Sequence, residues 1–262
     1  MDLKITGRWA VICAASEGLG FACTAALVAE GVNVVINARR TEQLEMAALQ
    51  LQEINSAVSI RWISGDITQP GTQKAVLTAS PMVDILITNA GGPPTGHFSE
   101  WSHDIWYQAI NTNMLTPITL IQAVINKMAD RSFGRIINIT SGTVKAPQNE
   151  LGLSNGARGG LTTFVSGLAK SHLLMRNNIN INNLLPGAFE TQRLRQTFKQ
   201  KALRCGDSPE NMAMQRSQKI PAGRFGIPEE FGAYCAFLCS THACYITGQN
   251  ILIDGGAYPG VF

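Results

Sequence analysis

Short apolar segments alternate with longer amphipathic ones along this chain of 262 residues, and this alternation limits the fold more than any other feature. The apolar segments have the length of strands, are rich in Val and Ile, and lack regular polar alternation, which is typical of strands buried on both faces of a parallel sheet. They are residues 9–13, 32–36, 59–63, 85–88, 135–139, 178–184 and 250–253. Helical segments lie between them, such as residues 42–54, where Thr41 is the expected N-cap. This order predicts an α/β protein with a doubly wound, seven-stranded parallel sheet.

Composition supports a single globular domain spanning residues 1–262, because 45% of the residues are hydrophobic and no internal linker or repeat interrupts the chain. Residues 188–225 break the rhythm with a long, polar and basic segment, which predicts a lid over a site. The net charge of +3 argues against general binding to nucleic acid or membranes. The start of the chain shows no apolar leader, and the cysteines form no CxxC pair, so we expect reduced thiols, no metal and a cytoplasmic location.

A glycine turn, residues 13–20, follows the first apolar segment and precedes a helical one. Glycines at such a place let the backbone approach a pyrophosphate, which then lies on the N–H groups of the helix N-terminus. The turn predicts a three-layer, doubly wound Rossmann fold that binds a dinucleotide, although an ordinary tight turn would have the same pattern. The predicted contacts are Ala14, Ser16, Gly18, Leu19 and Gly20.

The residues that end the second apolar segment favour NADP(H) as the dinucleotide. A site selective for NAD carries an acid there, which accepts a hydrogen bond from the ribose 2′-hydroxyl and repels a 2′-phosphate. Here Ala38 takes that position, and Arg39 and Arg40 follow, offering planar charged donors to a phosphate. Two arguments oppose this: the arginines could simply cover the surface, and Glu17 places a negative charge in the glycine turn.

Further segments match a known family in the same order along nearly the whole chain. Asp66-Ile67 follows the third apolar segment, Thr88-Asn89-Ala90-Gly91 follows the fourth, and Tyr245–Gln249 and Asp254–Gly256 lie near the C-terminus. Together with the glycine turn, the chain resembles the short-chain dehydrogenase/reductase family, and its motif layout resembles the 3-oxoacyl-carrier-protein reductases. Cys13 and Ala14 replace the usual Thr and Gly of the turn, and we expect Ala14 to be tolerated if its φ is negative.

The resemblance implies cofactor roles for further residues. Asp66 and Ile67 would contact the adenine, and Asn89, Ala90 and Gly91 would line the cofactor site. The nicotinamide carboxamide would be held by Pro186, Gly187 and Thr191. A homo-oligomer, in particular a tetramer, is also implied, with the helix expected at residues 151–174 as a main contact.

The family's catalytic Asn, Ser, Tyr and Lys are only half present. Asn113 and Ser141 match the Asn, which organises a water relay, and the Ser, which orients the carbonyl. Family spacing places Ser154 at the Tyr and Arg158 at the Lys, so that YxxxK becomes SxxxR. A serine hydroxyl is a far weaker acid than a phenol, whose pKa is about 10. Arg158 could bind the cofactor ribose, but it cannot release a proton at working pH.

Three explanations of this change remain open. In the first, the reductase survives and another group supplies the proton: Lys145, since a desolvated Lys can act as an acid at neutral pH, or Tyr258 reaching a neighbouring subunit. In the second, Ser141 and Ser154 hold a water chain while Arg158 stabilises an oxyanion. In the third, redox chemistry is lost, and the protein is an NADP-binding sensor, scaffold or non-redox enzyme.

We therefore expect an NADP(H)-dependent oxidoreductase acting on a carbonyl or hydroxyl group of a small molecule. Residues 193–219 carry seven basic side chains against two acids, which indicates either a docking face for an acyl carrier protein or coenzyme A, or a solvated helical surface. The basic residues are Arg193, Arg195, Lys199, Lys201, Arg204, Arg216 and Lys219.

Overall fold

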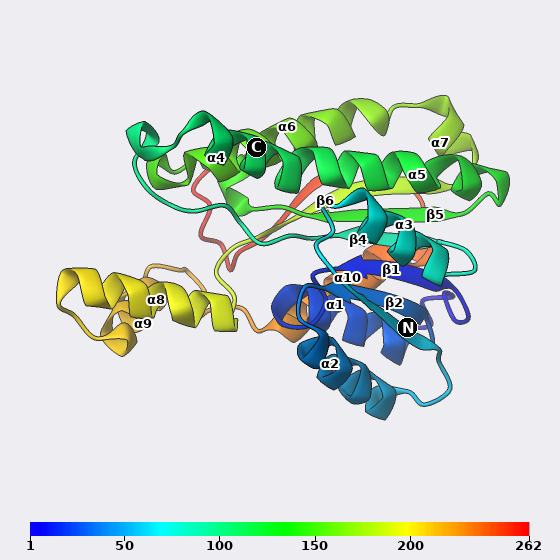
Figure 1. Ribbon diagram of the computed structural model, residues 1–262, viewed down its shortest axis with the longest axis horizontal. Coiled ribbons are helices and arrows are strands. Elements are labelled where there is room, and N and C mark those ends of the chain that lie inside the picture. Colours follow the sequence, from blue (N-terminus) through cyan, green and yellow to red (C-terminus); the bar gives the residue numbers. More distant parts are fainter. Residues whose placement is uncertain (262) are drawn as a thin grey trace.

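Seven parallel strands form one sheet in the order β3-β2-β1-β4-β5-β6-β7, which confirms the expected fold (Figure 1). The computed structural model describes residues 1–261; Phe262, the last residue of the predicted domain, and the side chain of Arg204 lie outside the described part. The strands are β1 (Trp9–Cys13), β2 (Asn33–Ala38), β3 (Ile60–Ser64), β4 (Ile85–Thr88), β5 (Gly134–Ile139), β6 (Ile179–Pro186) and β7 (Asn250–Ile253). Their bounds lie within two residues of the predicted segments, because each buried apolar run forms one strand.

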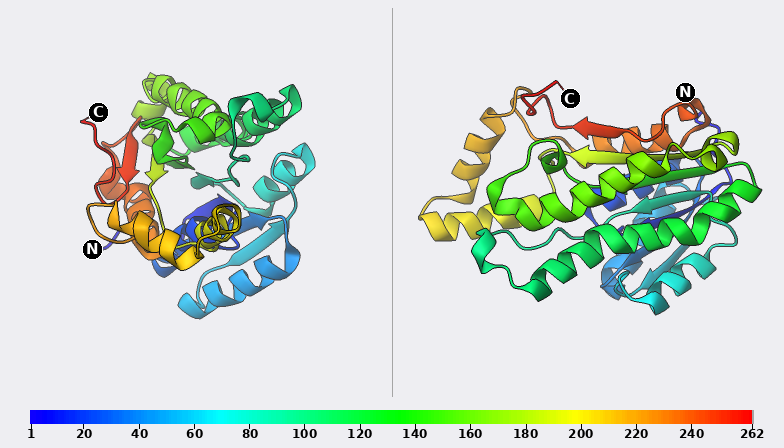
Figure 2. Two further views of the ribbon diagram at one scale, coloured as in Figure 1. Left: turned by 90° about the vertical axis from the view of Figure 1, so that its left-hand side faces the viewer. Right: turned by 90° about the horizontal axis from the view of Figure 1, so that it is seen from above.

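Helices cover both faces of the sheet and complete the three layers (Figures 1 and 2). One face packs against α1 (Gly18–Ala29), α2 (Thr41–Ile54) and α10 (Pro228–Cys239). The other packs against α3 (Pro70–Ala79), α5 (Thr116–Asp130) and α6 (Gly152–Leu168). The remaining helices are α4 (His103–Ile110), α7 (His172–Arg176), α8 (Gln192–Cys205) and α9 (Pro209–Gln218). Among the described residues, none of the helices is long and apolar enough to cross a membrane.

Two sequence-based helix boundaries are wrong. Thr41 is the first residue of α2, and the N-cap is Arg40, whose backbone is extended and whose side chain makes no capping bond. The single helix expected at residues 151–174 is divided, because Ser171 adopts an extended backbone between α6 and α7. Helix boundaries depend on local backbone choices that a hydrophobic pattern does not record.

Residues 188–225 form α8 and α9, which project beyond the end of the sheet (Figures 1 and 2). The buried ring of Phe198 anchors α8, lying 5.8 Å from the ring of Phe225. The Lys201 ammonium approaches Glu150 Oε2 at 3.9 Å and joins α8 to the loop before α6. The basic segment thus lies at the edge of the domain, and its function as a lid stays a prediction.

A polar row crosses four strands of the sheet, from the end of β4 through β5 and β6 to the first residue of β7. Thr88 Oγ1 donates to Asn138 Oδ1 at 2.7 Å, and Asn138 Nδ2 donates to Asn183 Oδ1 at 3.0 Å. Asn183 Nδ2 then donates to Asn250 Oδ1 at 2.8 Å. Neighbouring members are also register partners in the sheet. The polar row therefore locks β4, β5, β6 and β7 in register.

The backbone of the glycine turn is unusual at one position. Ala14 has a φ of +49°, in the left-handed region, so the negative φ that would make an alanine tolerable here is not present. Its carbonyl lies so close to Gly20 that a Cβ at Gly20 would collide with it. The turn must fold back tightly to let α1 start directly behind β1, and Ala14 absorbs the strain.

Replacing Ala14 by Gly should remove that strain. A left-handed conformation costs an L-residue roughly 1–2 kcal/mol, and the greater freedom of unfolded Gly offsets about 0.4–1 kcal/mol of the gain. We expect Ala14→Gly to raise the free energy of unfolding by up to about 1 kcal/mol in urea denaturation. The neighbouring Ala15→Gly is the control and should lower it, because Ala15 is buried and has no positive φ.

The polar row makes a second prediction about stability. Asn138→Ala leaves the Thr88 hydroxyl and the Asn183 amide oxygen without their partners inside the sheet. Since each orphaned buried group costs about 1–3 kcal/mol, the free energy of unfolding should fall by at least about 2 kcal/mol. Gln215→Ala, at an exposed position of α9, should change it by less than about 0.5 kcal/mol. Equal effects of the two variants would contradict the structural role of the row.

Candidate active site

A cavity of about 460 Å³ opens at the carboxyl edge of the sheet, around the point where the strand order reverses between β1 and β4. Open α/β sheets bind ligands at such a switch point. Most of the predicted cofactor residues line it, namely Ala14, Ser16, Gly18, Leu19, Arg39, Arg40, Asp66, Ile67, Asn89, Ala90, Gly91 and Thr191. The others, Gly20, Arg158, Pro186 and Gly187, do not line it. Chain segments far apart in sequence are thus gathered around one space.

The glycine turn is shaped to receive an anion on the N-terminus of α1. The N-cap Glu17 makes no side-chain capping bond, and the first turn of the helix holds no acidic residue. The backbone N–H groups of that turn are the usual donors to a phosphate. Gly18 has a φ of +60°, which suits the tight entry into the helix. The turn therefore fits the diphosphate of a dinucleotide.

Two arginines stand at the rim of the cavity after β2, and their surroundings differ. Arg40 Nη2 bonds Glu17 Oε1 at 3.2 Å, so the acid of the glycine turn is matched within the protein. Arg39 is exposed and forms no ion pair with any residue that the structure describes. Ala38 ends β2 without a carboxylate. The rim therefore offers one guanidinium without an ion-pair partner among the described residues, that of Arg39, at the end of β2.

Several lining residues were not predicted as site residues. Asn37 Nδ2 donates to the carbonyls of Ile63 and Gly65, at 2.9 and 3.2 Å, and so holds the ends of β2 and β3 together. The lining also contains Glu17, Ala38, Gly65, Thr68, Gly92, Thr112, Gln192 and Arg193. These positions adjoin predicted residues along the chain, and that adjacency was the only signal available in the sequence.

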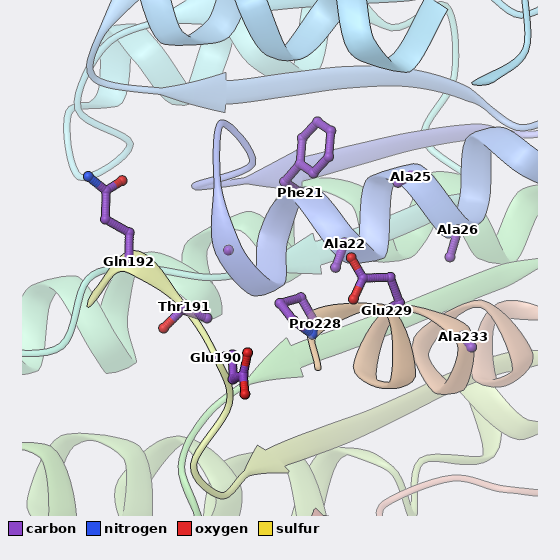
Figure 3. Close-up of a pocket in the computed structure, with 11 residues that line it drawn as sticks. Phe21, Ala22, Ala25, Ala26, Glu190, Thr191, Gln192, Pro228, Glu229 and Ala233 are labelled. Atoms are coloured by element: carbon purple, nitrogen blue, oxygen red, sulfur yellow. The ribbon is translucent and has the colours of Figure 1, made fainter. Parts of the chain in front are cut away.

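A second cavity of about 320 Å³ lies behind the glycine turn, between the starts of α1 and α10 (Figure 3). Phe21 and several alanines give it an apolar wall, and Glu190 and Glu229 are its acids. Of the predicted cofactor residues it contains only Gly18 and Thr191, and the predicted catalytic residues line neither cavity. The larger cavity, with most of the predicted cofactor residues in its wall, is therefore the better candidate for the cofactor site.

Asn113 lies in a π-helical turn, Asn111–Leu115, between α4 and α5. Its side chain is buried, and Nδ2 donates to the carbonyl of Ala109 at 3.3 Å. Its Oδ1 has no hydrogen-bond partner among the described residues. A buried amide oxygen in this state needs a water or a ligand group, which fits the predicted role of Asn113 in a water relay. Short π-turns of this kind are frequent at functional sites.

Ser141 follows β5 and caps the short 3₁₀ helix Gly142–Val144. Its Oγ accepts from the backbone N–H and the hydroxyl of Thr143, at 3.2 and 3.0 Å, and its own hydroxyl donates to none of the described residues. Lys145 ends this helix, half-buried, with its Nζ 6.0 Å from the ring centre of Tyr258 in the same chain. The predicted Lys145, on the Ser141 loop, thus faces the predicted Tyr258, in the segment that follows β7.

Ser154 and Arg158 lie one turn apart on the buried face of α6. Arg158 Nη1 donates to the carbonyls of Ile139 and Thr140 at 2.8 and 2.7 Å, and Nη2 donates to Ala90 at 3.4 Å. Burial, and then the charge of Arg193, lower the pKa of Arg158 to about 10, so it stays protonated at neutral pH. Arg158 therefore ties α6 to the ends of β4 and β5, and much of its bonding capacity is already used.

Pro186, Gly187 and Thr191 form the wall that follows β6. Gly187 donates its N–H to Ile253 at 2.8 Å and lies so close to Asp254 that no Cβ would fit. Thr191 is the N-cap of α8, and its methyl group packs toward Gly18. Thr191 thereby links the glycine turn to the start of the projecting segment.

Comparison with known proteins agrees with this arrangement. The short chain dehydrogenase family profile matches residues 8–202. Acetoacetyl-CoA reductase of Acinetobacter sp. (strain RA3849) is 29% identical over 256 residues, which cover 95% of this chain and 97% of that reductase. The 3-oxoacyl-[acyl-carrier-protein] reductase of Vibrio cholerae is 28% identical over 262 residues, covering 98% and 99% of the two chains.

Among solved structures, L-sorbose reductase of Gluconobacter frateurii, complexed with NADPH and L-sorbose, superimposes with a TM-score of 0.93. It is 27% identical, and the match covers 100% of both chains. The family predicted from the motifs is therefore confirmed, and the chain belongs to the short-chain dehydrogenase family.

Proposed function

We propose that this protein is an NADP(H)-dependent oxidoreductase that acts on a carbonyl or hydroxyl group of a small molecule. The observation that carries the proposal is the combination, in one cavity, of an uncapped helix N-terminus and an unpaired Arg39 without a carboxylate at Ala38. The L-sorbose reductase structure contains NADPH, which supports the same cofactor here. Bound NADPH supplies a hydride to a carbonyl carbon.

The residues of the cavity and of the wall after β6 would divide the work of holding that cofactor. The glycine turn would take the diphosphate, Arg39 would take the 2′-phosphate, and Asp66 with Ile67 would border the adenine. Asn89, Ala90 and Gly91 would line the path toward Ser141. Thr191 would hold the carboxamide end together with Pro186 and Gly187, which lie outside the cavity lining. Ser141 donates its free hydroxyl proton to the substrate carbonyl and so fixes the orientation of that group.

Lys145 is our candidate for the proton donor that replaces the family's Tyr. It lies on the same loop as Ser141, and a lysine ammonium placed beside a reacting oxygen can give up its proton there. Ser154 is too weak an acid, and Arg158 keeps its proton at neutral pH. The Asn113 Oδ1 is positioned to hold a water through which Lys145 regains a proton from solvent.

One observation favours a second function, that of a non-redox NADP-binding protein. The guanidinium of Arg158 is bonded to backbone carbonyls, as a structural side chain would be. Such a protein would bind the cofactor as a sensor or scaffold, or act on a bound carbonyl without hydride transfer.

In either function we infer a homo-oligomer, because Gly159 and Gly167 of α6 leave open space on their helix for close packing.

The cofactor assignment predicts different effects for the two rim arginines. A hydrogen bond to a charged group is worth about 1.5–3 kcal/mol, so Arg39→Ala should raise the Kd for NADPH at least about tenfold. The Kd for NADH should stay nearly constant, because it has no 2′-phosphate. Arg40→Ala is the matched control and should have the smaller effect, since Arg40 is bound to Glu17. Fluorescence titration of both cofactors measures this, and tighter binding of NADH by the wild type would refute the assignment.

The proton donor can be tested by comparing three single variants in NADPH oxidation with a panel of ketones, quinones and β-ketoacyl thioesters. Lys145→Ala should lower kcat by about 10²–10⁴-fold, the usual contribution of general acid catalysis. Ser154→Ala should retain most of the turnover, and Lys127→Ala on α5 controls for the loss of a charge elsewhere. A strong loss with Ser154→Ala and none with Lys145→Ala would favour the water chain. Tight NADPH binding without turnover of any panel compound would favour the non-redox function.

A further inference from the structure

Arg193 has a position that the proposed function does not explain. It stands in the first turn of α8 and lines the large cavity together with Gly92. Its guanidinium packs against that glycine so closely that a Cβ there would collide with Nη2. No side-chain hydrogen bond or ion pair joins Arg193 to another residue in the described part of the chain. The cavity wall therefore holds a guanidinium with all its donors available.

Arg158 is the second cationic group at this place. Its Nη2 reaches Ala90, two residues before Gly92, so both arginines meet the same loop. The charge of Arg193 is felt at Arg158, whose pKa it helps to lower, and partial burial lowers the pKa of Arg193 itself. Arg158 is buried and Arg193 is exposed, so two like charges stand along one loop, and an anion bound between them would relieve their repulsion.

The described residues supply no such anion. The carboxylates that do form ion pairs are Asp84, Glu17, Glu150 and Glu230, and their partners are other basic residues. Thr112, the neighbour of the orphaned Asn113, borders the same cavity and adds a hydroxyl. The pair Arg158–Arg193 is therefore a site with positive charge, free donors and no counterion of its own.

We propose that Arg193, supported by the buried charge of Arg158, binds a carboxylate carried by the substrate itself, so that this enzyme acts on an oxo acid or hydroxy acid. A guanidinium and a carboxylate match in a planar, two-bonded geometry, which fixes both the position and the orientation of a small molecule. The inference rests on the proposed function, because it names the substrate class of the same site.

Two other sources of negative charge compete for Arg193. The cofactor diphosphate also binds in this cavity, but its cradle is the glycine turn, and Arg193 instead contacts Gly92 on the opposite wall. Phosphates of a coenzyme A thioester lie at the far end of a long flexible arm, remote from the reacting carbonyl. Arg158 instead bonds the carbonyl of Thr140, directly before Ser141, so the pair favours a charge close to the reacting carbonyl. Both alternatives are separate arms of the test.

Calorimetric titration of the full-length protein, with and without saturating NADPH, tests the proposal. The probes are pyruvate, acetoacetate and benzoylformate, the methyl ester of each, and acetoacetyl-CoA. At least one acid should bind the wild type about tenfold more tightly than its ester, as one charge-assisted contact provides. Arg193→Met should remove that preference and leave ester binding within about twofold, while Arg193→Lys should restore part of it. The control Arg195→Met, an exposed arginine on the same helix, should retain the preference.

Three results would overturn the proposal. The first is equal binding of acids and esters, or no binding of either at 10 mM, a probe concentration far above typical substrate affinities of about 1 μM–1 mM. The second is a rise in the Kd for NADPH in Arg193→Met, which would assign Arg193 to the cofactor diphosphate. The third is tighter binding of acetoacetyl-CoA than of acetoacetate, abolished by Arg193→Met. Failure of the proposed function would give a different result. NADPH would not bind, while the preference for acids could still be measured on the cofactor-free protein.

Discussion

The hydrogen bonds from Thr88 to Asn250 hold four parallel strands in register at the edge that carries the site. Apolar side chains drive the strands together, but they do not choose between neighbouring registers as strictly as a row of directional bonds does. Asn89 and Ser141 leave the sheet one and two residues after their strands end. Their positions are therefore fixed by the row, and the cavity depends on it.

Arg158 connects the sheet to the layer of helices that packs on it. Its bonds to Ile139 and Thr140 dock α6 on the end of β5, directly before Ser141. A residue predicted to touch the cofactor ribose is thus also a structural connection between two layers. Its charge remains in the site without a carboxylate partner, which gives the inner cavity a positive character.

The sequence alone predicts the fold well, because strands buried on both faces leave an apolar signature of distinctive length. Most residues that line the larger cavity were also predictable, since they follow strand ends in a fixed order. The left-handed Ala14 could not be predicted, because the requirement for positive φ comes from the packing of α1 behind β1. The polar row was not predicted, because Asn138 and Asn183 lie inside apolar segments and become neighbours only through the strand register.

The catalytic side of the site was less accessible to sequence reasoning. Spacing placed Ser154 and Arg158 correctly on one face of α6. It could not show that the guanidinium of Arg158 donates hydrogen bonds to backbone carbonyls. Arg193 was one of seven basic residues in a polar segment, and its direction into the cavity depends on how α8 leaves Thr191. Electrostatic roles arise from the surroundings of a side chain, which differ among residues of equal charge.

The way Arg158 is bonded also constrains how such an active site can change during evolution. One nitrogen, Nη1, donates to the carbonyls of both Ile139 and Thr140, and the second, Nη2, donates to Ala90. A lysine has a single nitrogen, so it could keep the first two bonds but has no second nitrogen for the third carbonyl. A substitution at this position therefore changes the packing of two layers together with the charge of the site, so that stability and chemistry are selected at the same time.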